Sequence, residues 1–355
     1  MLFNFDNLKD FNSYDSSLKQ KNLFLHEILR LNYYHKKNSK NYANIIEIKN
    51  KNKVKKIEEL PFLPTRIFKE INLKTIGDKN VFKILESSGT GGNVSRIFLD
   101  KENAYSQIKI LCKIFKDFFR INNRMPMIIF DKKKSIKQNL KHTAREAAYT
   151  GFSFMGKNHF FVLDENENLK IKELREYLKK HKDSNIFFFG LTSVIWKTLQ
   201  KMDKIKLNLE NSILLHGGGW KKIKDQNANK KNFNYLIKKK FNISKVHDYY
   251  GMVEQTGSIF FECEKGFFHT SFFSDIVIRN KFFEIQKFKK SGLIQIISLI
   301  PTSYPGHSII TEDKGTIFGE DNCKCGRSGK YFKVEGRIPK AEIRGCGNID
   351  DYQRE

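Results

Sequence analysis

Short apolar segments alternate with longer amphipathic segments between residues 81 and 257, and this alternation constrains the fold more than any other feature. Asp100 is placed to cap a helix, and residues 171–181 and 194–202 have the apolar spacing of helices. The segments with the length and composition of buried strands are residues 81–85, 127–130, 160–163, 186–189 and 212–215. Such alternation is typical of an α/β fold, and continuously apolar strands are typical of a sheet that is buried. We therefore predict an α/β fold with largely buried strands.

The pattern changes on both sides of this region. The first 60 residues are polar and helical in spacing, and the segment LPFLPT at residues 60–65 ends them. Beyond residue 257 the helical pattern stops, and residues 272–278, 282–286 and 293–298 alternate like short strands. We divide the chain into a helical region (1–60), an α/β core (61–257), a β-rich subdomain (258–335) and a C-terminal tail (336–355).

The composition excludes several classes of protein. With 355 residues, 39% hydrophobic and 13% aromatic, the chain can bury a large core, so it is neither disordered nor fibrous. The formal net charge is +26, but only twelve of the 65 basic residues are arginines, which nucleic-acid surfaces use for bidentate contacts. Lysine is scattered and accompanies abundant Asn, Ile and Phe. Compositional drift therefore explains the charge better than a polyanion-binding surface does.

The N-terminus and the cysteines indicate a compartment. Residues 1–6 include an acid and precede no apolar run, so no secretory signal is predicted, and no apolar run approaches the ~18 residues of a membrane span. Five cysteines in a chain of this length do not make a disulfide framework. We expect a cytoplasmic protein whose cysteines bind a metal or carry thiol chemistry.

Four residues have the spacing of a metal site. Five residues separate Cys263 from His269, and one residue separates Cys323 from Cys325. Three thiolates and one imidazole suit Zn²⁺ in a closed, tetrahedral, structural geometry. Spacing alone leaves free buried thiols as an equal alternative.

A glycine-rich segment follows the first predicted strand. Residues 86–93 (ESSGTGGN) combine small hydroxyl side chains with glycines, whose backbone N–H groups can surround phosphate oxygens. Alone, the segment fits a surface turn as well. Residues 248–254 (DYYGMVE), 311–313 (TED) and 336–337 (GR) follow it in order, and together these motifs resemble those of the adenylate-forming superfamily.

The resemblance narrows to one branch. The segments LPFLPTRIFK, LHGGGWK, DYYGMVEQTG, SYPGHSIITED and GRIPKAEIRGC are similar to those of the acyl-protein synthetase family of the LuxE type, and they span residues 60–346. This resemblance implies the large domain of adenylate-forming enzymes, with mixed sheets, flanking helices and a β-rich subdomain. Relatives of the phenylacetate ligase type have a comparable Cys/His set, which favours zinc over free thiols.

The resemblance assigns nucleotide-binding residues by position. A hydroxyl and glycine loop would cradle the ATP phosphates, a glycine run would form one wall of the adenine site, and a tyrosine would stack on the other side. The corresponding residues are Ser88, Gly89, Thr90 and Gly92 for the phosphates, Gly217, Gly218 and Gly219 for the wall, and Tyr250 with Gly251 for the stack. Gly91 departs from the usual Thr-Thr-Gly pattern and removes one hydroxyl.

Three further residues receive roles in the same way. Glu254 would hold Mg²⁺, Asp313 would accept hydrogen bonds from the ribose, and Arg337 would contact ribose or phosphate. Two alternatives stay open from the residues themselves. Tyr250 could be a buried turn residue, and Arg337 could form a structural ion pair.

Cys346 is the candidate acyl acceptor. It lies between glycines near Lys340 and Arg344, where positive neighbours favour the thiolate, and the family has an acceptor cysteine near this end. Only 18 residues follow Arg337, so we expect the tail to replace the mobile C-terminal domain of other adenylate-forming enzymes. Nine extended residues reach at most ~30 Å, enough to fold back onto an acyl adenylate. An inert terminal thiol is the alternative, and Cys112 is expected in the core.

The expected function is that of an ATP-dependent acyl-protein synthetase. It would activate a carboxylic acid, expected to be a fatty acid, as an acyl adenylate and transfer it to a cysteine thioester. The acyl-accepting partner implied by the family is a fatty acid reductase. Two alternatives remain: an acyl- or aryl-CoA ligase, and a catalytically silent, zinc-stabilised protein that binds acyl groups or nucleic acid.

Overall fold

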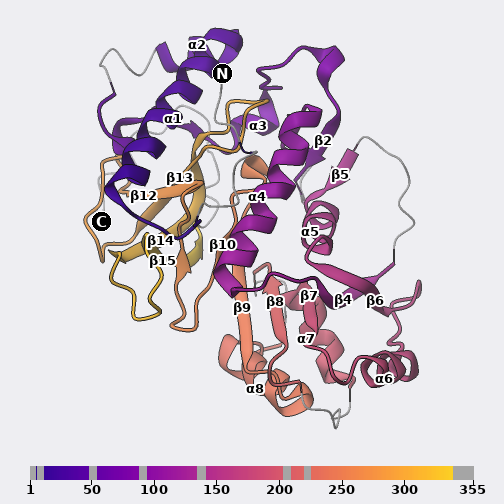
Figure 1. Cartoon of the computed structure of the whole chain (residues 1–355). Coiled ribbons are helices and arrows are strands. Elements are labelled where there is room, and N and C mark those ends of the chain that lie inside the picture. Colours follow the sequence, from indigo (N-terminus) through magenta and orange to yellow (C-terminus); the bar gives the residue numbers. More distant parts are fainter. Residues whose placement is uncertain are drawn as a thin grey trace.

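The structure is a computed structural model that describes residues 5, 12–47, 54–87, 94–133, 141–202, 209–219 and 225–338, with the backbone alone for residues 141–145. Within these residues the chain forms three β-sheets, with helices packed around them (Figure 1). No helix in these ranges has the length and apolar character needed to cross a membrane.

The central sheet contains four of the five predicted strands of the α/β core, and the fifth, at residues 81–85, lies in a smaller sheet. The order of the central sheet is β10-β9-β8-β7-β4-β6, and all neighbours run parallel except β10, which is antiparallel to β9. The strands are β10 (Phe260–Phe261), β9 (Lys245–Tyr250), β8 (Ile213–Gly217), β7 (Phe187–Leu191), β4 (Met125–Lys132) and β6 (Gly156–Leu163). The predicted strands from residue 127 to 215 all lie in this sheet, so the α/β prediction is confirmed.

Helices cover both faces of the central sheet, which explains why its strands are apolar throughout. On one face Phe115 meets Phe187 edge to face, with 5.1 Å between the ring centres. On the other face Phe241 lies 5.4 Å from Phe188. The first face is covered by α4 (Lys101–Phe119) and α5 (Ala144–Ser153), and the second by α6 (Ile171–Lys180), α7 (Thr192–Gln200) and α8 (Lys230–Phe241). Asp100 caps α4 as predicted, since its side chain accepts from the N–H of Asn103.

Two further sheets flank this core. The larger has the antiparallel order β11-β15-β14-β13-β12, and β1 joins β14 in parallel. Its strands are β1 (Leu63–Pro64), β11 (Phe268–His269), β12 (Ser274–Arg279), β13 (Gly292–Ser298), β14 (Ser308–Glu320) and β15 (Lys330–Arg337). In the smaller sheet β2 (Lys83–Glu86) lies between β3 (Arg96–Leu99) and β5 (Lys141–Thr143). No α-helix lies beyond residue 257 in the described part of the chain.

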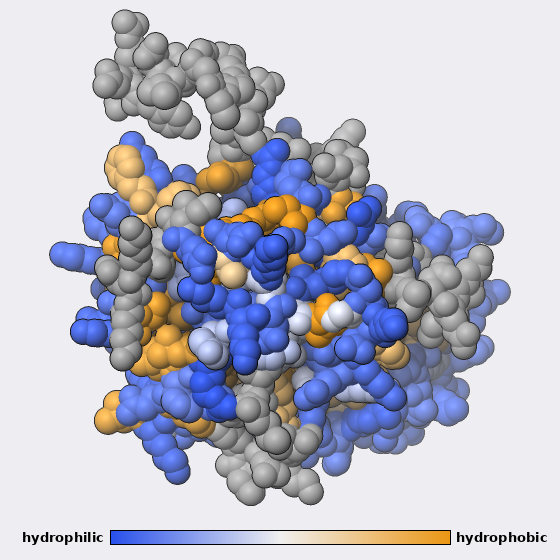
Figure 2. Space-filling view, turned by 90° about the horizontal axis from the view of Figure 1, so that it is seen from above, coloured by the Kyte–Doolittle hydropathy of each residue, from blue (hydrophilic) through white to orange (hydrophobic). Residues whose placement is uncertain are grey.

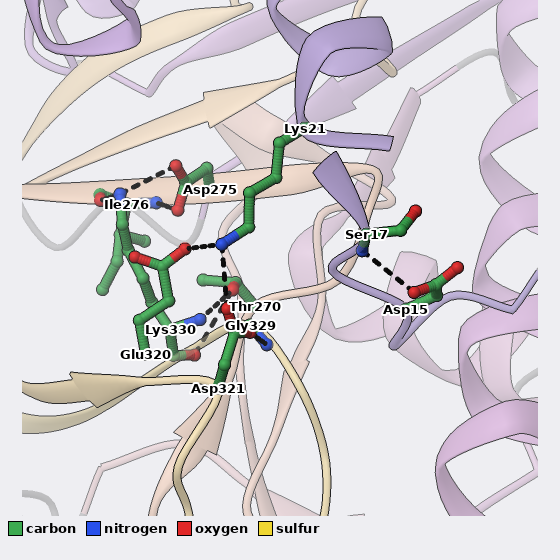
Figure 3. Close-up of polar contacts among 10 residues, drawn as sticks. All are labelled: Asp15, Ser17, Lys21, Thr270, Asp275, Ile276, Glu320, Asp321, Gly329 and Lys330. Carbon is green, nitrogen blue, oxygen red and sulfur yellow. Dashed lines mark hydrogen bonds and ion pairs between the residues drawn. The ribbon is translucent and has the colours of Figure 1, made fainter. Parts of the chain in front are cut away.

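The N-terminal helices α1 (Leu18–Asn38) and α2 (Lys40–Glu47) pack on the larger flanking sheet. Figure 3 shows Lys21 reaching from α1 to the carboxylates of Glu320 and Asp321, with N–O distances of 2.6 and 2.8 Å. Nearby, the poorly exposed Lys330 pairs with Asp275 at 2.8 Å. Water screens the Lys21 contacts more strongly than the Lys330 pair, because Lys21 is the more exposed lysine.

One predicted strand is wrong. Residues 282–286, for which alternation predicts a strand, form a turn in which only Ile285 makes an isolated bridge, to Arg279. Asn280 causes the turn, because its side-chain oxygen accepts from the N–H groups of Phe282 and Glu284 at 2.9 and 3.0 Å. An asparagine that bonds to its own backbone two residues later favours a turn over a ladder.

Candidate functional site

The carboxyl ends of β8 and β9 bring two predicted motifs together. Gly217 pairs with Tyr249 across the parallel ladder, and a Cβ atom on Gly217 would lie 2.2 Å from Tyr249 Cε1. Only glycine permits this approach. Gly218 has a φ of 89°, which turns the chain away from the strand, and no described atom lies within 4 Å of the Cβ position of Gly219. Residues 217–219 therefore form an open stretch of backbone at the end of β8, which we call the glycine ledge.

Tyr249 and Tyr250 point to opposite faces of β9, because successive side chains of a strand alternate. Its hydroxyl donates to Asp313 Oδ2 at 2.9 Å, and its ring lies among those of Phe260, Phe268 and Phe332. Burial raises the pKa of the Tyr250 phenol, and the Asp313 carboxylate raises it further. The hydroxyl is thus a donor at neutral pH. In this structure Tyr249, and not Tyr250, lies against the glycine run.

Asp313 also contacts Arg337, which was predicted to contact the ribose or the phosphate of the nucleotide. The two residues are register partners in β14 and β15, and Arg337 Nε lies 3.5 Å from Asp313 Oδ1. The Arg337 side chain is 72% exposed, so the guanidinium is accessible to a ligand as well as to the carboxylate. Tyr250, Asp313 and Arg337 therefore form one contiguous group, although they come from three separate motifs.

Glu254 lies where segments of all three sheets meet. It is in the 3₁₀ helix η4 (Val253–Gln255), which follows β9 and packs against β3. The motif at residues 303–313 holds this helix in place, because the Tyr304 hydroxyl donates to the Glu254 backbone oxygen at 2.9 Å and Gln255 Nε2 donates to the Gly306 oxygen at 2.6 Å. The Glu254 residue is mostly buried, at 9% exposure.

The predicted phosphate-binding residues Ser88, Gly89, Thr90 and Gly92 lie outside the described residues. On either side of them, the Ser87 N–H donates to the Ser95 oxygen, and the Ser95 N–H donates to Ser87 Oγ at 2.9 Å. The segment therefore connects β2 to β3, and β3 packs against the helix that carries Glu254. Cys346 also lies outside the described residues.

The structure brings the four predicted metal ligands together. One donor atom from each of Cys263, His269, Cys323 and Cys325 lies within 4.8 Å of the other three. Four ligands at Zn–S distances of ~2.3 Å in a tetrahedron are separated by roughly 3.8 Å, so small movements would complete the site. Burial lowers the pKa of His269 to about 4, which keeps its imidazole neutral, as a metal ligand must be. The donor set and its geometry fit a structural Zn²⁺.

A cavity of about 980 Å³ lies beside this cluster, at the amino ends of the parallel strands. Its lining includes Arg120, Arg124, Lys245, Cys325 and Arg327. Strands rise ~3.3 Å per residue, so this cavity is separated from the Gly217 and Tyr250 edge by the length of the sheet. It is therefore distinct from the predicted nucleotide site.

Two residues of the site were not predicted from the sequence. Tyr249 occupies the position against the glycine ledge, and only the register of β8 and β9 reveals this. His216 precedes the glycines and is buried; its Nδ1 shares a hydrogen bond of 2.9 Å with Thr192 Oγ1, and Thr192 Oγ1 also donates to the Gly217 oxygen at 3.1 Å. This chain of bonds fixes the start of the ledge. The one feature of the sequence that pointed to His216 is its position directly before three glycines.

Known structures share this arrangement of sheets and helices. A 2-hydroxyisobutyryl-CoA ligase in an open conformation, in complex with 2-HIB-AMP and CoA, superposes with a TM-score of 0.69 at 14% identity, over 93% of this chain and 77% of that one. The same ligase in its postadenylation state gives a TM-score of 0.70 at 14% identity, over 92% and 70%. The chain therefore has the fold of the adenylate-forming enzymes.

Sequence comparison then identifies the family. Residues 2–352 match the acyl-protein synthetase family LuxE, and the chain belongs to that family. A long-chain-fatty-acid–luciferin-component ligase of Aliivibrio fischeri is 24% identical in an alignment of 244 residues that covers 65% of this chain. The match spans 62% of that relative's length.

Proposed function

We propose that this chain is an ATP-dependent acyl-protein synthetase. The observation that carries the proposal is the group of Tyr250, Asp313 and Arg337, joined by β9 to the segment of Glu254. These residues come from separate motifs and meet at the carboxyl edge of a parallel sheet, where ligands of open α/β sheets bind. Family membership supports the same reaction class.

The first step would form an acyl adenylate. An oxygen of the substrate carboxylate attacks the α-phosphorus of ATP, the bond to the bridging oxygen breaks, and pyrophosphate leaves. Asp313 would accept from the ribose hydroxyls, while Arg337 and the loop at residues 88–92 would stabilise the charge on the phosphates. Glu254 would hold Mg²⁺, which when bound neutralises part of that charge.

Tyr250 would change partner when the nucleotide binds. Its hydroxyl occupies one oxygen of Asp313 in this structure. A ribose that takes both oxygens would release Tyr250, whose ring could then move toward the adenine. The stacking role assigned by resemblance thus requires a rearrangement at β9.

The second step would form a thioester. The Cys346 thiolate attacks the acyl carbon, the bond to AMP breaks, and AMP leaves with its phosphate oxygen. A thiol on a short tether acts at an effective concentration of roughly mM, which favours capture on the protein over hydrolysis. The substrate proposed is a long-chain fatty acid and the acyl-accepting partner a reductase, in line with the relative's name and the family.

We also propose a structural role for the Cys/His cluster. Cys263 in the loop after β10, His269 in β11, and Cys323 and Cys325 in the loop after β14 would hold one Zn²⁺, with all four positions filled by protein. A filled coordination sphere offers no position to a substrate. The ion would therefore stabilise the fold without entering the reaction.

A CoA ligase is the second candidate, because one solved structure that shares the fold is a CoA ligase in complex with CoA. The test is ATP–pyrophosphate exchange with a panel of carboxylic acids, followed by mass spectrometry of the intact protein. Exchange with a protein-bound acyl group supports the synthetase, and exchange with release of acyl-CoA supports the ligase. Absence of exchange with every acid would reject both.

A further inference from the structure

A single short loop exposes four large apolar side chains. The 280–290 loop joins β12 to β13 and has the sequence NKFFEIQKFKK. Within it Phe282 is 70% exposed, Ile285 55%, and Phe283 and Phe288 48% each. Figure 2 shows that the described surface is mainly hydrophilic in the view from above, with apolar residues gathered in separate patches. A cluster of exposed apolar side chains on a short loop therefore indicates a docking surface.

The loop is held in one conformation from its base. Arg279 Nη1 donates to the Phe283 oxygen at 2.8 Å, Nη2 donates to the Glu58 oxygen at 2.5 Å, and Nε donates to Gln295 Oε1 at 2.5 Å. At the other end the Lys289 N–H donates to the Ile317 oxygen at 2.7 Å. The apolar side chains are thus presented by a braced loop.

Phe283 adds a conformational argument. Its φ is 65°, in the left-handed region that is unfavourable for a bulky side chain. Glycine or asparagine would relieve this strain, yet the chain has phenylalanine there. Its ring lies 5.7 Å from that of Phe62, so the apolar surface continues onto the segment before β1.

Lysines surround these apolar side chains. Lys281, Lys287, Lys289 and Lys290 are all exposed, and Glu284 is the one acidic residue of the loop. Protein interfaces are depleted in lysine at their centres. An anionic lipid surface favours lysine, because its headgroups attract positive charge, and aromatic rings lie at the boundary between its headgroups and acyl chains.

We propose that the 280–290 loop docks the protein on the surface of an anionic lipid bilayer. The tip with Phe282 and Phe283 enters the headgroup region, together with Phe288, and the lysines contact the headgroup phosphates. The contact is peripheral. On the basis of the proposed function, it would also place the enzyme at the layer into which long-chain fatty acids partition.

The test is co-sedimentation of the full chain with vesicles, one set of phosphatidylcholine alone and one of phosphatidylcholine mixed with phosphatidylserine. The wild-type chain should sediment with the anionic set, and added salt should release it. The double variant Phe282→Ser, Phe288→Ser should lower the apparent affinity by about tenfold or more, since burial of one phenylalanine corresponds to at least that factor. The variant Lys281→Gln, Lys287→Gln should lower it as well, by roughly fivefold for each lysine.

Matched controls separate the loop from general charge and hydrophobicity. Tyr33→Ser, Tyr235→Ser removes two aromatic side chains of 68% and 61% exposure from helices, and Lys172→Gln, Lys197→Gln removes two exposed lysines. Both controls should bind anionic vesicles as the wild type does. Equal loss in controls and loop variants would overturn the proposal, as would a wild type that binds no vesicles; the apolar loop would then be assigned to a protein partner.

The readout is independent of the proposed function. Vesicle binding without ATP–pyrophosphate exchange would support the docking loop and reject the synthetase. Exchange without vesicle binding would reject the docking loop and support the proposed activation of a carboxylic acid.

Discussion

The hydroxyl of Tyr250 donates a hydrogen bond to the carboxylate of Asp313, which lies 63 residues further along the chain, at a distance of 2.9 Å. This bond joins the end of the central parallel sheet to the antiparallel sheet beside it. It also joins two of the motifs on which the nucleotide site is proposed. The predictions below begin from this contact.

Asp313→Ala should raise the KM for ATP by about 10- to 100-fold with a smaller effect on kcat, because a lost hydrogen-bonded charge weakens ground-state binding. Steady-state pyrophosphate exchange measures both constants. Glu312→Ala removes the exposed neighbouring carboxylate and should leave KM unchanged. An unchanged KM in Asp313→Ala would reject the ribose role.

Glu254→Gln should reduce adenylation by at least about 10³-fold while the protein stays folded, because it removes one metal-binding charge without a change in volume. Exchange assays and circular dichroism check the two halves of this expectation. Glu173→Gln, at an exposed helical position, is the control and should be fully active. Near-normal exchange in the Glu254 variant would contradict the magnesium assignment.

The Cys/His cluster should contain about one Zn²⁺ per chain by elemental analysis. Cys323→Ser should remove the metal and lower the free energy of unfolding by about 3 kcal/mol or more, because metal binding contributes directly to folding. The control is Cys112→Ser, which changes a half-buried thiol on α4 and should keep the zinc. Metal-free wild-type protein would remove the site altogether.

Cys346→Ser should keep ATP–pyrophosphate exchange and lose the hydroxylamine-sensitive acyl label. Adenylation precedes the thiol step, and a hydroxyl is a far weaker nucleophile than a thiolate. Cys112→Ser should retain both exchange and label. If the Cys346 variant still carries an acyl thioester, the tail is not the acceptor, and the CoA ligase becomes the better candidate.

Stability should fall as the pH is lowered from about 6.5 toward 4. His35 and His307 stack with 4.8 Å between ring centres, and burial lowers the pKa of His35 from 6.5 to about 3 and that of His307 well below its usual value. The unfolded chain therefore binds more protons in this window. One such histidine accounts for about 2 to 3 kcal/mol of unfolding free energy between pH 6.5 and 4.5.

Urea unfolding at several pH values measures this dependence. His35→Gln should be less stable at pH 7, because it loses bonds to Thr75 and to the Pro301 oxygen, but its stability should depend less on pH. His26→Gln, at an exposed side chain, should keep the wild-type slope. The same slope in His35→Gln would show that other groups cause the acid sensitivity.

Local patterns in the sequence were sufficient to place the α/β core and four of the six strands of its central sheet, but not β9 or β10. Apolar segments bounded by turn residues are local features, and a sheet covered on both faces requires strands that are apolar throughout. The metal-site residues are also close in sequence within each pair, Cys263 with His269 and Cys323 with Cys325. Short loops keep the members of each pair near one another, so their spacing predicted the ligand set.

Which side chains meet across those segments depends on the folded chain as a whole. Tyr249 faces the glycine ledge and Tyr250 faces Asp313 because of strand register, and a shift of one residue would exchange them. The Cys263/His269 pair and the Cys323/Cys325 pair form one cluster because β11 pairs with β15. At residues 282–286 the alternation predicted a strand, although Asn280 is a local turn signal; the long-range part of this turn is the bonding of Arg279 to Glu58 and Gln295. Register and long-range hydrogen bonds depend on the whole fold, so no local pattern contains them.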